Sequence, residues 1–170
     1  MATMEILEHP DPMLREASQQ VERFDADLRE LVDNLFDTLA ARGGIGLCAP
    51  QTGALQRVLV VHVPGDGYGP RVYINPRILW TAAPGFVEES CLSVPGIVGS
   101  VIRGTRARVA AQDANGNGFE LEVDGLHAVC LQHEIDHLDG KLFIDRLTWF
   151  GRLRLRLSAA RAARREATAA

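Results

Sequence analysis

The segment 133–137, which reads His-Glu-Ile-Asp-His, constrains the fold more than any other part of the sequence. Two histidines four positions apart lie on one face of a helix, and the glutamate beside the first then leans toward the same point. The residues that precede them are mostly apolar, namely Leu126, Val129, Cys130 and Leu131. The segment therefore predicts a helix over residues 125–138, ended by Gly140, whose histidine face is buried and able to hold a metal ion.

A catalytic metal site of this kind needs a third protein ligand and leaves one position for water. In the metzincin pattern that ligand is a histidine six residues after the second, where this sequence has Phe143. The gluzincin pattern needs a glutamate on a following helix, and the glutamate after the motif is Glu166, in the tail. Both patterns fit poorly, and two structural histidines beside an incidental glutamate remain the alternative to a metal site.

A thiolate is the remaining candidate for the third ligand. Cys91 lies in the segment 88–95, which is too polar to be an ordinary core strand. A lone cysteine is otherwise a small buried apolar residue, and we assign Cys48 and Cys130 to that class. Cys130 precedes His133 by three residues, so its side chain can also reach the pocket that the histidines face.

The segment 44–51, Gly-Ile-Gly-Leu-Cys-Ala-Pro-Gln, has two glycines around an apolar residue, which lets its backbone approach another molecule closely. A phosphate-binding loop would need Lys and Ser/Thr after the second glycine, or a helix just beyond the loop. The sequence meets neither condition, which argues against nucleotide binding. A tight turn that enters a strand is the structural alternative.

Residues 25–42 predict an amphipathic helix with one buried face. Its apolar residues are spaced by three and four positions: Leu28, Leu31, Val32, Leu35, Phe36 and Leu39. Asp25 is the expected N-cap, and Gly43-Gly44 supplies the left-handed stop that glycine adopts at little cost.

Short β-rich runs follow, and they predict strands at 58–63, 71–79, 85–88, 106–112 and 119–123. The segment 115–118, Asn-Gly-Asn-Gly, is a hairpin signal between the last two. A third helix is expected over 149–163. Strands flanked by separate helices indicate an α+β fold, with small antiparallel or mixed sheets packed around the metal-binding helix.

Composition narrows the class of protein. A chain of 170 residues, 46% hydrophobic and 24% charged, suits one domain over 1–170, with a basic C-terminal helix and tail over about 147–170. A formal net charge of −4 does not favour nucleic acid as the main ligand. Three widely spaced cysteines, no signal peptide and no long apolar run lead us to expect a cytoplasmic protein.

Three of these segments together resemble the motifs of the peptide deformylases, which take the forms G-φ-G-φ-A-A-P-Q, E-G-C-L-S and H-E-x-D-H. This sequence has GIGLCAPQ, ESCLS and HEIDH in the same order, and the resemblance extends from the proline-rich opening to about Arg146. It departs at Cys48, where Ala is usual, and at Ser90, where Gly is usual. Both residues are small, which implies a modified pocket rather than lost activity. Ser90 nevertheless adds a side chain where the usual glycine would let a substrate approach the backbone closely.

The resemblance implies a metal-dependent hydrolase that removes the formyl group from the N-terminal formyl-methionine of nascent polypeptides and releases formate. It implies that Cys91, His133 and His137 bind the metal ion and that Glu134 is the catalytic acid and base. The family typically uses Fe²⁺. Zn²⁺, Ni²⁺ or Co²⁺ suit the same ligands, so the spacing of the ligands does not name the ion.

The resemblance also implies the substrate contacts. The Gln51 amide and the backbone N–H of Leu92 would hydrogen-bond the formyl oxygen, and backbone groups of Gly46 would help to align the peptide. Glu89 would be a buried carboxylate beside the substrate, paired with Arg103. The remaining expected lining residues contact the peptide or the methionine side chain: Ile45, Leu126 and Val129.

Two other functions stay open at this point: a zinc peptidase of the H-E-x-x-H type, and a non-catalytic deformylase-like protein with a structural metal ion. The presence of Glu134 and Gln51 argues against the second, because a structural site needs neither. The arginine-rich segment 152–165 predicts contact with ribosomal RNA near emerging chains, with a solvated helix face as the alternative.

Overall fold

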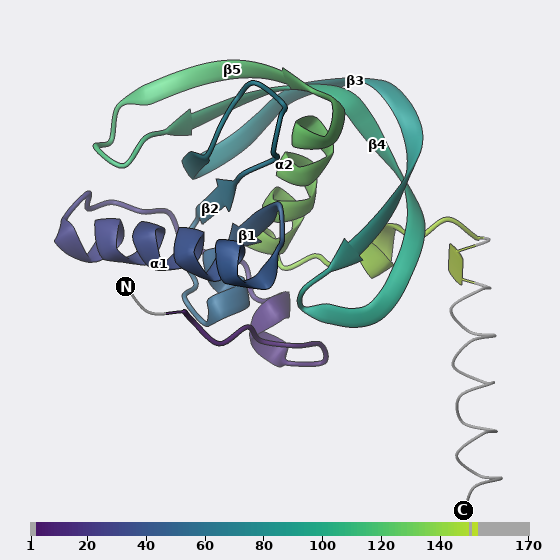
Figure 1. Cartoon of the computed structure of the whole chain (residues 1–170), viewed down its shortest axis with the longest axis horizontal. Helices are drawn as coiled ribbons and strands as arrows, with labels where there is room; N and C mark the ends of the chain where they lie inside the picture. Colours follow the sequence, from purple (N-terminus) through teal and green to yellow (C-terminus); the bar gives the residue numbers. More distant parts are fainter. Residues whose placement is uncertain (1–2, 150, 153–170) are drawn as a thin grey trace, which may run out of the picture.

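The computed structural model describes residues 3–149, 151 and 152 (Figure 1). In this part of the chain, helix α1 spans Ala26–Arg42 and helix α2 spans Gly125–Leu138. Short 3-10 turns lie at Pro12–Arg15, Ala49–Thr52 and Phe143–Arg146. The strands are β1 (Gly46–Cys48), β2 (Val58–Val61), β3 (Arg71–Cys91), β4 (Val94–Gln112) and β5 (Gly118–Asp124). The architecture is α+β, as the sequence predicts.

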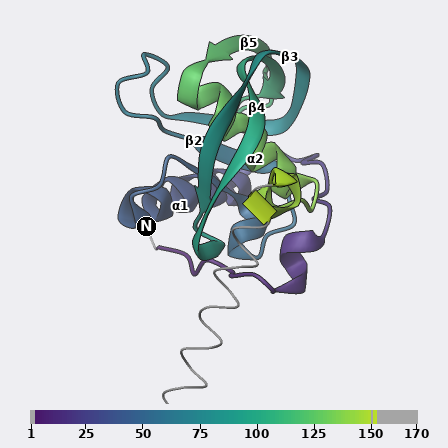
Figure 2. The ribbon, with the colours of Figure 1, turned by 90° about the vertical axis from the view of Figure 1, so that its right-hand side faces the viewer.

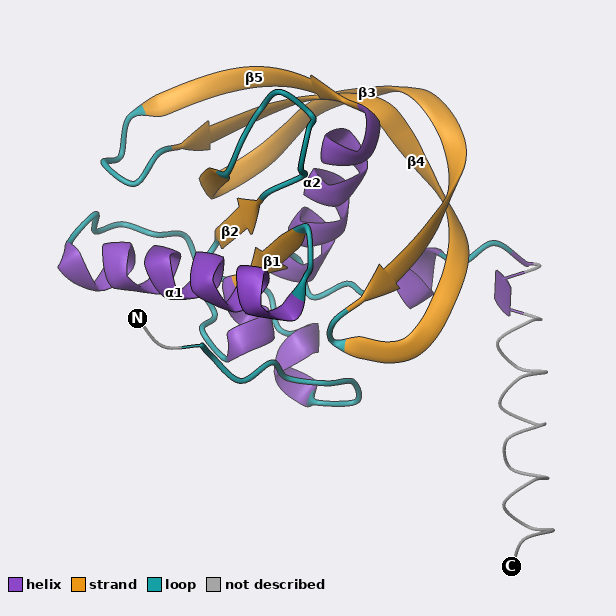
Figure 3. Cartoon of the chain, viewed as in Figure 1, coloured by secondary structure: helices purple, strands orange, loops and turns teal. Residues whose placement is uncertain are grey.

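The strands form one antiparallel sheet in the described residues, and their order in space, β1-β2-β3-β4-β5, is their order in the chain. The sheet curves around α2, which lies inside the bend (Figures 1 and 3). Seen from the side, the β3–β4 hairpin crosses the molecule in front of α2 (Figure 2). Helix α2 is therefore the centre of the core rather than a surface element.

Burial of α2 explains why its sequence is apolar on most sides. The helix packs against all five strands of the sheet, and its buried residues Ala128, Leu131, Ile135 and Leu138 join one cluster with Tyr73 and with valines of the strands. At about 25 cal/mol per Å² of apolar surface removed from water, such contacts dominate the stability of the element. The polar residues of α2 are consequently buried too, and each needs a partner.

Helix α1 confirms the predicted spacing and both of its ends. Asp25 caps the first turn by accepting a hydrogen bond from the Leu28 N–H at 3.2 Å, and Gly43 takes the left-handed conformation at φ 65°. The apolar face of α1 packs over β1 and β2 in a second cluster, and Figure 1 shows the helix beside these strands. This packing fixes the start of β1, which leads into the site.

The strands predicted at 71–79 and 85–88 are in fact parts of one long strand, β3, and β4 starts well before the predicted residue 106. Pro76, Pro84 and Gly104 interrupt the alternation of apolar residues, which made the sequence look like separate strands. A register shift lies at Pro76 and another between Glu89 and Cys91, whereas Pro84 pairs with Gly104 without a shift. The predicted hairpin turn at 115–118 joins β4 to β5.

The predicted third helix lies largely outside the described residues, although Trp149, Gly151 and Arg152 are helical. Within the described residues, no helix has both the length and the apolar character that crossing a membrane requires.

Candidate metal centre

Helix α2 places the two histidines of the H-E-x-x-H motif side by side in the interior. The rings of His133 and His137 are 5.1 Å apart between centroids, and both residues are buried. Glu134 follows His133 and is also buried. The prediction that these residues share an inward face of a helix is confirmed.

Cys91 reaches this face from the end of β3. The shift of register between Glu89 and Cys91, followed by the tight turn that pairs Cys91 with Val94, brings its side chain toward α2. The Sγ atom lies 3.2 Å from Nε2 of His137, and Cys91, His133 and His137 each offer a ligand atom within 4.8 Å of the other two. Within the described part of the chain this is the one such cluster of metal-ligating side chains.

The three ligands fit a divalent transition metal by their chemistry. One thiolate and two imidazoles form a donor set that Zn²⁺, Fe²⁺ and similar ions accept. Burial lowers the pKa of His137 to about 3, which keeps its imidazole neutral, the form that binds metal. Among the described residues, Glu134 Oε2 is one of a few buried side-chain oxygens without a hydrogen-bond partner, so it can bond a polar group held at the cluster.

Glu89 orients the first of these histidines. Its Oε2 lies 2.8 Å from Nδ1 of His133, which leaves Nε2 of that ring for a metal ion. Arg103 donates to both oxygens of Glu89, at 2.7 and 3.1 Å, so the predicted pairing of Glu89 with Arg103 is present. Burial opposes ionisation of Glu89, but the hydrogen bonds from His133 and Arg103 outweigh it and lower the pKa of Glu89 to about 2.

The hydrogen-bond acceptors around His133 also change the pKa of its imidazole ring. Burial lowers the pKa of His133, but its hydrogen bonds with Cys91 and Glu89 outweigh burial and raise that pKa to about 10. A proton and a metal ion therefore compete for the site between Cys91 and His133, and metal binding releases protons.

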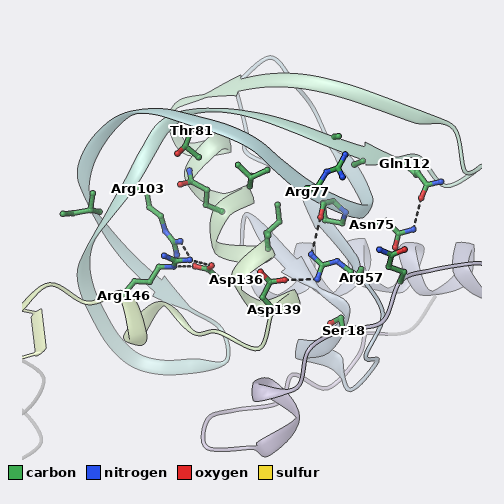
Figure 4. A pocket seen from close by; sticks show the side chains of 18 residues that line it. Ser18, Arg57, Asn75, Arg77, Thr81, Arg103, Gln112, Asp136, Asp139 and Arg146 are labelled. Carbon is green, nitrogen blue, oxygen red and sulfur yellow. Dashed lines mark hydrogen bonds and ion pairs between the residues drawn. The ribbon is translucent and has the colours of Figure 1, made fainter.

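The chain of charges continues from Glu89 to another side of α2. Arg103 donates to Asp136 Oδ2 at 2.6 Å, and Arg146 donates to both carboxylate oxygens of Asp136. Figure 4 shows the guanidinium groups of Arg103 and Arg146 converging on Asp136, and all three residues line a cavity of about 920 Å³. The metal ligands do not line this cavity. The ion pairs link His133 through Glu89, Arg103 and Asp136 to the surface.

Glu134 is poised beside the ligands in a narrow space. Burial raises the pKa of its carboxyl group above the ordinary value. Gly46 of β1 passes directly alongside: a Cβ atom at Gly46 would lie 2.6 Å from Glu134 Oε1 and closer still to Cys130 Sγ. The glycine that the sequence marked for close backbone approach thus makes room for Glu134.

Gln51 is held with its amide nitrogen facing the cluster. Its Oε1 accepts from the backbone N–H of Cys48 at 3.0 Å and from the Cys48 thiol at 3.2 Å. Its Nε2 points toward Ser93 Oγ at 3.1 Å and Cys91 Sγ at 3.6 Å. Cys48 is fully buried in the core, as predicted, and it also fixes which end of the Gln51 amide faces the site.

These groups surround a cavity of about 350 Å³. Most of the predicted site residues line it: Ile45, Gly46, Gln51, Glu89, Cys91, Leu92, Leu126, Val129, His133 and Glu134. His137 lies behind this lining, against Cys91. Cys130 also lines the cavity, as its spacing from His133 suggested, together with Gly43, Gly44, Glu88 and Ser90.

Sequence reasoning missed several supporting residues. Ser93, which bonds Gln51, gives no signal beyond its place after the cysteine motif. Asp136 is an acidic residue on an otherwise buried helix, and that charge could have indicated a buried cationic partner. The bonds of Arg103 and Arg146 to Asp136 were missed as well, because no sequence motif connects these three positions.

Comparison with known proteins agrees with this geometry. The family model described as polypeptide deformylase matches residues 3–152. A peptide deformylase of Hahella chejuensis is 46% identical over 157 residues, covering 92% of this chain and 94% of the relative. The peptide deformylase of Pseudomonas aeruginosa is 45% identical over the same length, with the same coverage.

Solved structures show the same fold. A peptide deformylase from Legionella pneumophila superposes with a TM-score of 0.85 at 41% identity, covering 98% of both chains. That of Ehrlichia chaffeensis in complex with actinonin gives a TM-score of 0.84 at 41% identity, covering 89% of this chain and 92% of that one. With the Cys-His-His site in place, the chain belongs to the polypeptide deformylase family and is a metallohydrolase of the peptide deformylase type.

Proposed function

We propose that Cys91, His133 and His137 hold one Fe²⁺ ion and that this site removes the formyl group from the N-terminal methionine of nascent polypeptides. The observation that carries the proposal is the meeting of three ligand atoms within 4.8 Å, next to the unpartnered Oε2 of Glu134. A divalent ion in this site supplies Lewis acidity, which makes water nucleophilic near neutral pH.

Glu134 is the catalytic acid and base in this proposal. Its raised pKa suits a carboxylate that takes a proton from the attacking water and then gives it to the leaving amine. The products are formate and a peptide with a free N-terminus. Its buried position beside Gly46 keeps the carboxylate close to where the formyl carbon would sit.

Gln51 and Leu92 stabilise the developing negative charge on the formyl oxygen. The Gln51 amide nitrogen already faces Cys91, because Cys48 occupies its oxygen, and the Leu92 N–H follows in the next residue. Fixed donors of this kind contribute about 3 kcal/mol each in comparable oxyanion sites. Glu89, whose two oxygens are engaged by His133 and Arg103, orients the His133 ring and also lines the cavity beside the substrate.

The cavity of about 350 Å³ accepts the methionine side chain. Val129 and the partly exposed Leu126 form the α2 side of this pocket, and backbone groups of Ile45 and Gly46 align the peptide from the β1 side. An apolar wall with few polar groups suits an unbranched thioether.

The test of the proposal is release of formate from formyl-Met-Ala-Ser by protein prepared anaerobically with Fe²⁺. Glu134→Ala and Cys91→Ala should each abolish release, and an acetylated peptide should remain intact. Parallel preparations with Zn²⁺, Ni²⁺ and Co²⁺ compare the ions. Absence of turnover by folded, iron-loaded protein would contradict the proposal, and turnover with zinc but not with iron would contradict the choice of ion.

We also propose that the protein acts in the cytoplasm, on chains leaving the ribosome, and that one domain covers residues 1–170. The arginine-rich segment 152–165, most of which lies outside the described residues, supplies the ribosome contact through phosphate. Deletion of residues 153–170 should reduce co-sedimentation with ribosomes at low salt and leave turnover of the free peptide unchanged. Unchanged co-sedimentation would contradict the contact.

A further inference from the structure

A second buried polar network lies outside the metal centre, at the start of α2. Nδ1 of His127 is 2.7 Å from Asp66 Oδ2, and Nε2 of His127 is 2.7 Å from the Tyr73 hydroxyl. Asp66 belongs to the loop between β2 and β3, and Tyr73 belongs to β3. His127 and Tyr73 are fully buried, so neither ring is accessible to a substrate. The network is therefore structural in its chemistry.

The hydrogen bonds assign one orientation to the His127 ring. The carboxylate of Asp66 accepts from Nδ1–H, so Nε2 of neutral His127 accepts a hydrogen bond from the Tyr73 hydroxyl. A buried apolar side chain would fill the same space without fixing a direction. Three separate segments are thus held to one another by two directional bonds.

The network matters because the first turn of α2 lacks the usual local support. Asp124 occupies the N-cap position, but its side chain makes no capping hydrogen bond, and Gly125 begins the helix at φ 55°. The loop between β2 and β3 supplies the missing support: the Tyr68 ring lies 4.8 Å from the His127 ring, and its hydroxyl donates to Asp124 at 3.4 Å. Tertiary contacts, rather than a cap, fix where α2 starts.

The same turn carries one wall of the substrate pocket. Leu126, directly before His127, lines the cavity with a side chain that is 54% exposed, and Val129 lines it less than one turn later. Leu126 has little packing of its own, so its position depends on the backbone that His127 holds.

We propose that Asp66, His127 and Tyr73 are positioning residues for substrate selectivity: they hold the first turn of α2 and thereby set the pocket wall at Leu126 and Val129. The proposal rests on the assignment of this cavity to the methionine side chain. Loss of either bond lets the turn shift, which weakens recognition of a long side chain. A formyl-glycine substrate has no side chain to contact this wall, so its kcat/KM is unchanged.

The test uses two variants that each remove one bond: Tyr73→Phe, which keeps the size of the side chain, and Asp66→Ala, which removes the carboxylate acceptor. For each, kcat/KM is measured on formyl-Met-Ala-Ser and on formyl-Gly-Ala-Ser. One methylene in an apolar pocket discriminates at least about tenfold, so a shifted wall should lower the Met/Gly ratio by about fivefold or more, mainly through KM. The kcat on the glycine peptide and the metal content should stay as in the unmodified protein.

The matched control is Thr38→Val, which removes a buried hydroxyl that accepts from the Met4 N–H at 2.8 Å in α1. It tests whether any buried polar deletion changes selectivity, and its Met/Gly ratio should not move. Calorimetric affinities of Met-Ala-Ser and Gly-Ala-Ser for the same proteins give a readout that does not depend on turnover. If only the proposed function is wrong, no protein will release formate, but the ratio of the Met-Ala-Ser and Gly-Ala-Ser affinities will still change in the two variants.

A Met/Gly ratio that stays within about twofold of the unmodified protein in both folded variants, in kinetics and in calorimetry, would overturn the proposal. An equal fall in kcat on both peptides would also overturn it, because that result would place the network in the chemical step or in general stability.

Discussion

Gly46 illustrates how a single residue can set the space for a reaction. Its backbone runs against Glu134 and Cys130, at a point where any side chain would overlap with both. Flexible side-chain ends can give way at a small cost, but here one of them is the catalytic carboxylate. A larger residue at this position should therefore lower the activity more than the stability.

Gly46→Ala should lower kcat on a formyl-methionine peptide by about 100-fold, because a misplacement of about 1 Å in an active-site group has that effect. Kinetics on iron-loaded protein provide the measurement. Bound metal, determined in the same samples, should be unchanged, since Gly46 does not contact the ligands. A variant with normal kcat would show that Glu134 can move without loss.

Glu89→Gln should weaken metal binding by about 10- to 100-fold, the usual effect of losing the partner of a histidine ligand. The amide would replace a carboxylate that accepts from both His133 and Arg103. Competition with a chromophoric chelator gives the affinity. Glu88→Gln, the same change at an exposed neighbouring residue, is the control, and equal losses in both variants would refute the role of Glu89.

At the scale of elements, helices were predictable from sequence and the long hairpin was not. Helices α1 and α2 have apolar residues at regular spacing and clear glycine or aspartate boundaries. The β3–β4 hairpin continues through Pro76, at a register shift, and through Pro84, which pairs with Gly104, and such pairing depends on the partner strand. The metal ligands belong to short motifs, but the Asp66–His127–Tyr73 network joins segments that no motif connects.

The start of α2 should also respond to pH. Burial lowers the pKa of His127, against the opposing effect of Asp66, while Arg71 lowers it further. Tyr68 and Tyr73 also face the ring. Because the unfolded histidine takes up a proton first, at about pH 6.5, stability from neutral His127 is fully present above that pH and is lost as pH falls toward the folded pKa.

His127→Gln should therefore destabilise the protein more at about pH 7.5 than at about pH 5. Urea denaturation of both proteins at the two pH values gives the difference in free energy of unfolding. A difference that grows on acidification would mean that the folded pKa of His127 is raised, and the interpretation of its burial would be wrong.

For the whole molecule, the metal centre joins parts of the chain that would otherwise depend on packing alone. Cys91 ends β3, whereas His133 and His137 lie on α2, so one ion would tie the hairpin to the central helix. A ligand that binds the folded state stabilises it by mass action. The site should thus contribute to global stability as well as to chemistry.

Saturating Zn²⁺ or Fe²⁺ should raise the free energy of unfolding by about 2.7 kcal/mol when free metal exceeds its Kd about a hundredfold. Thermal unfolding with and without chelator measures the effect. Cys91→Ala should lose it, while Cys48→Ala, which removes another buried thiol, should keep it. A metal-dependent shift in the Cys91 variant would place the ion elsewhere.

The strand order has a consequence for biosynthesis. Because β1 to β5 are neighbours in both chain and sheet, each strand can pair with one that has already left the ribosome. Helix α2 emerges after all of them and brings two of the three metal ligands. Capture of the metal ion is therefore expected near the end of synthesis. Metal content of chains stalled before Gly125 would check this, because such chains should hold no ion at Cys91.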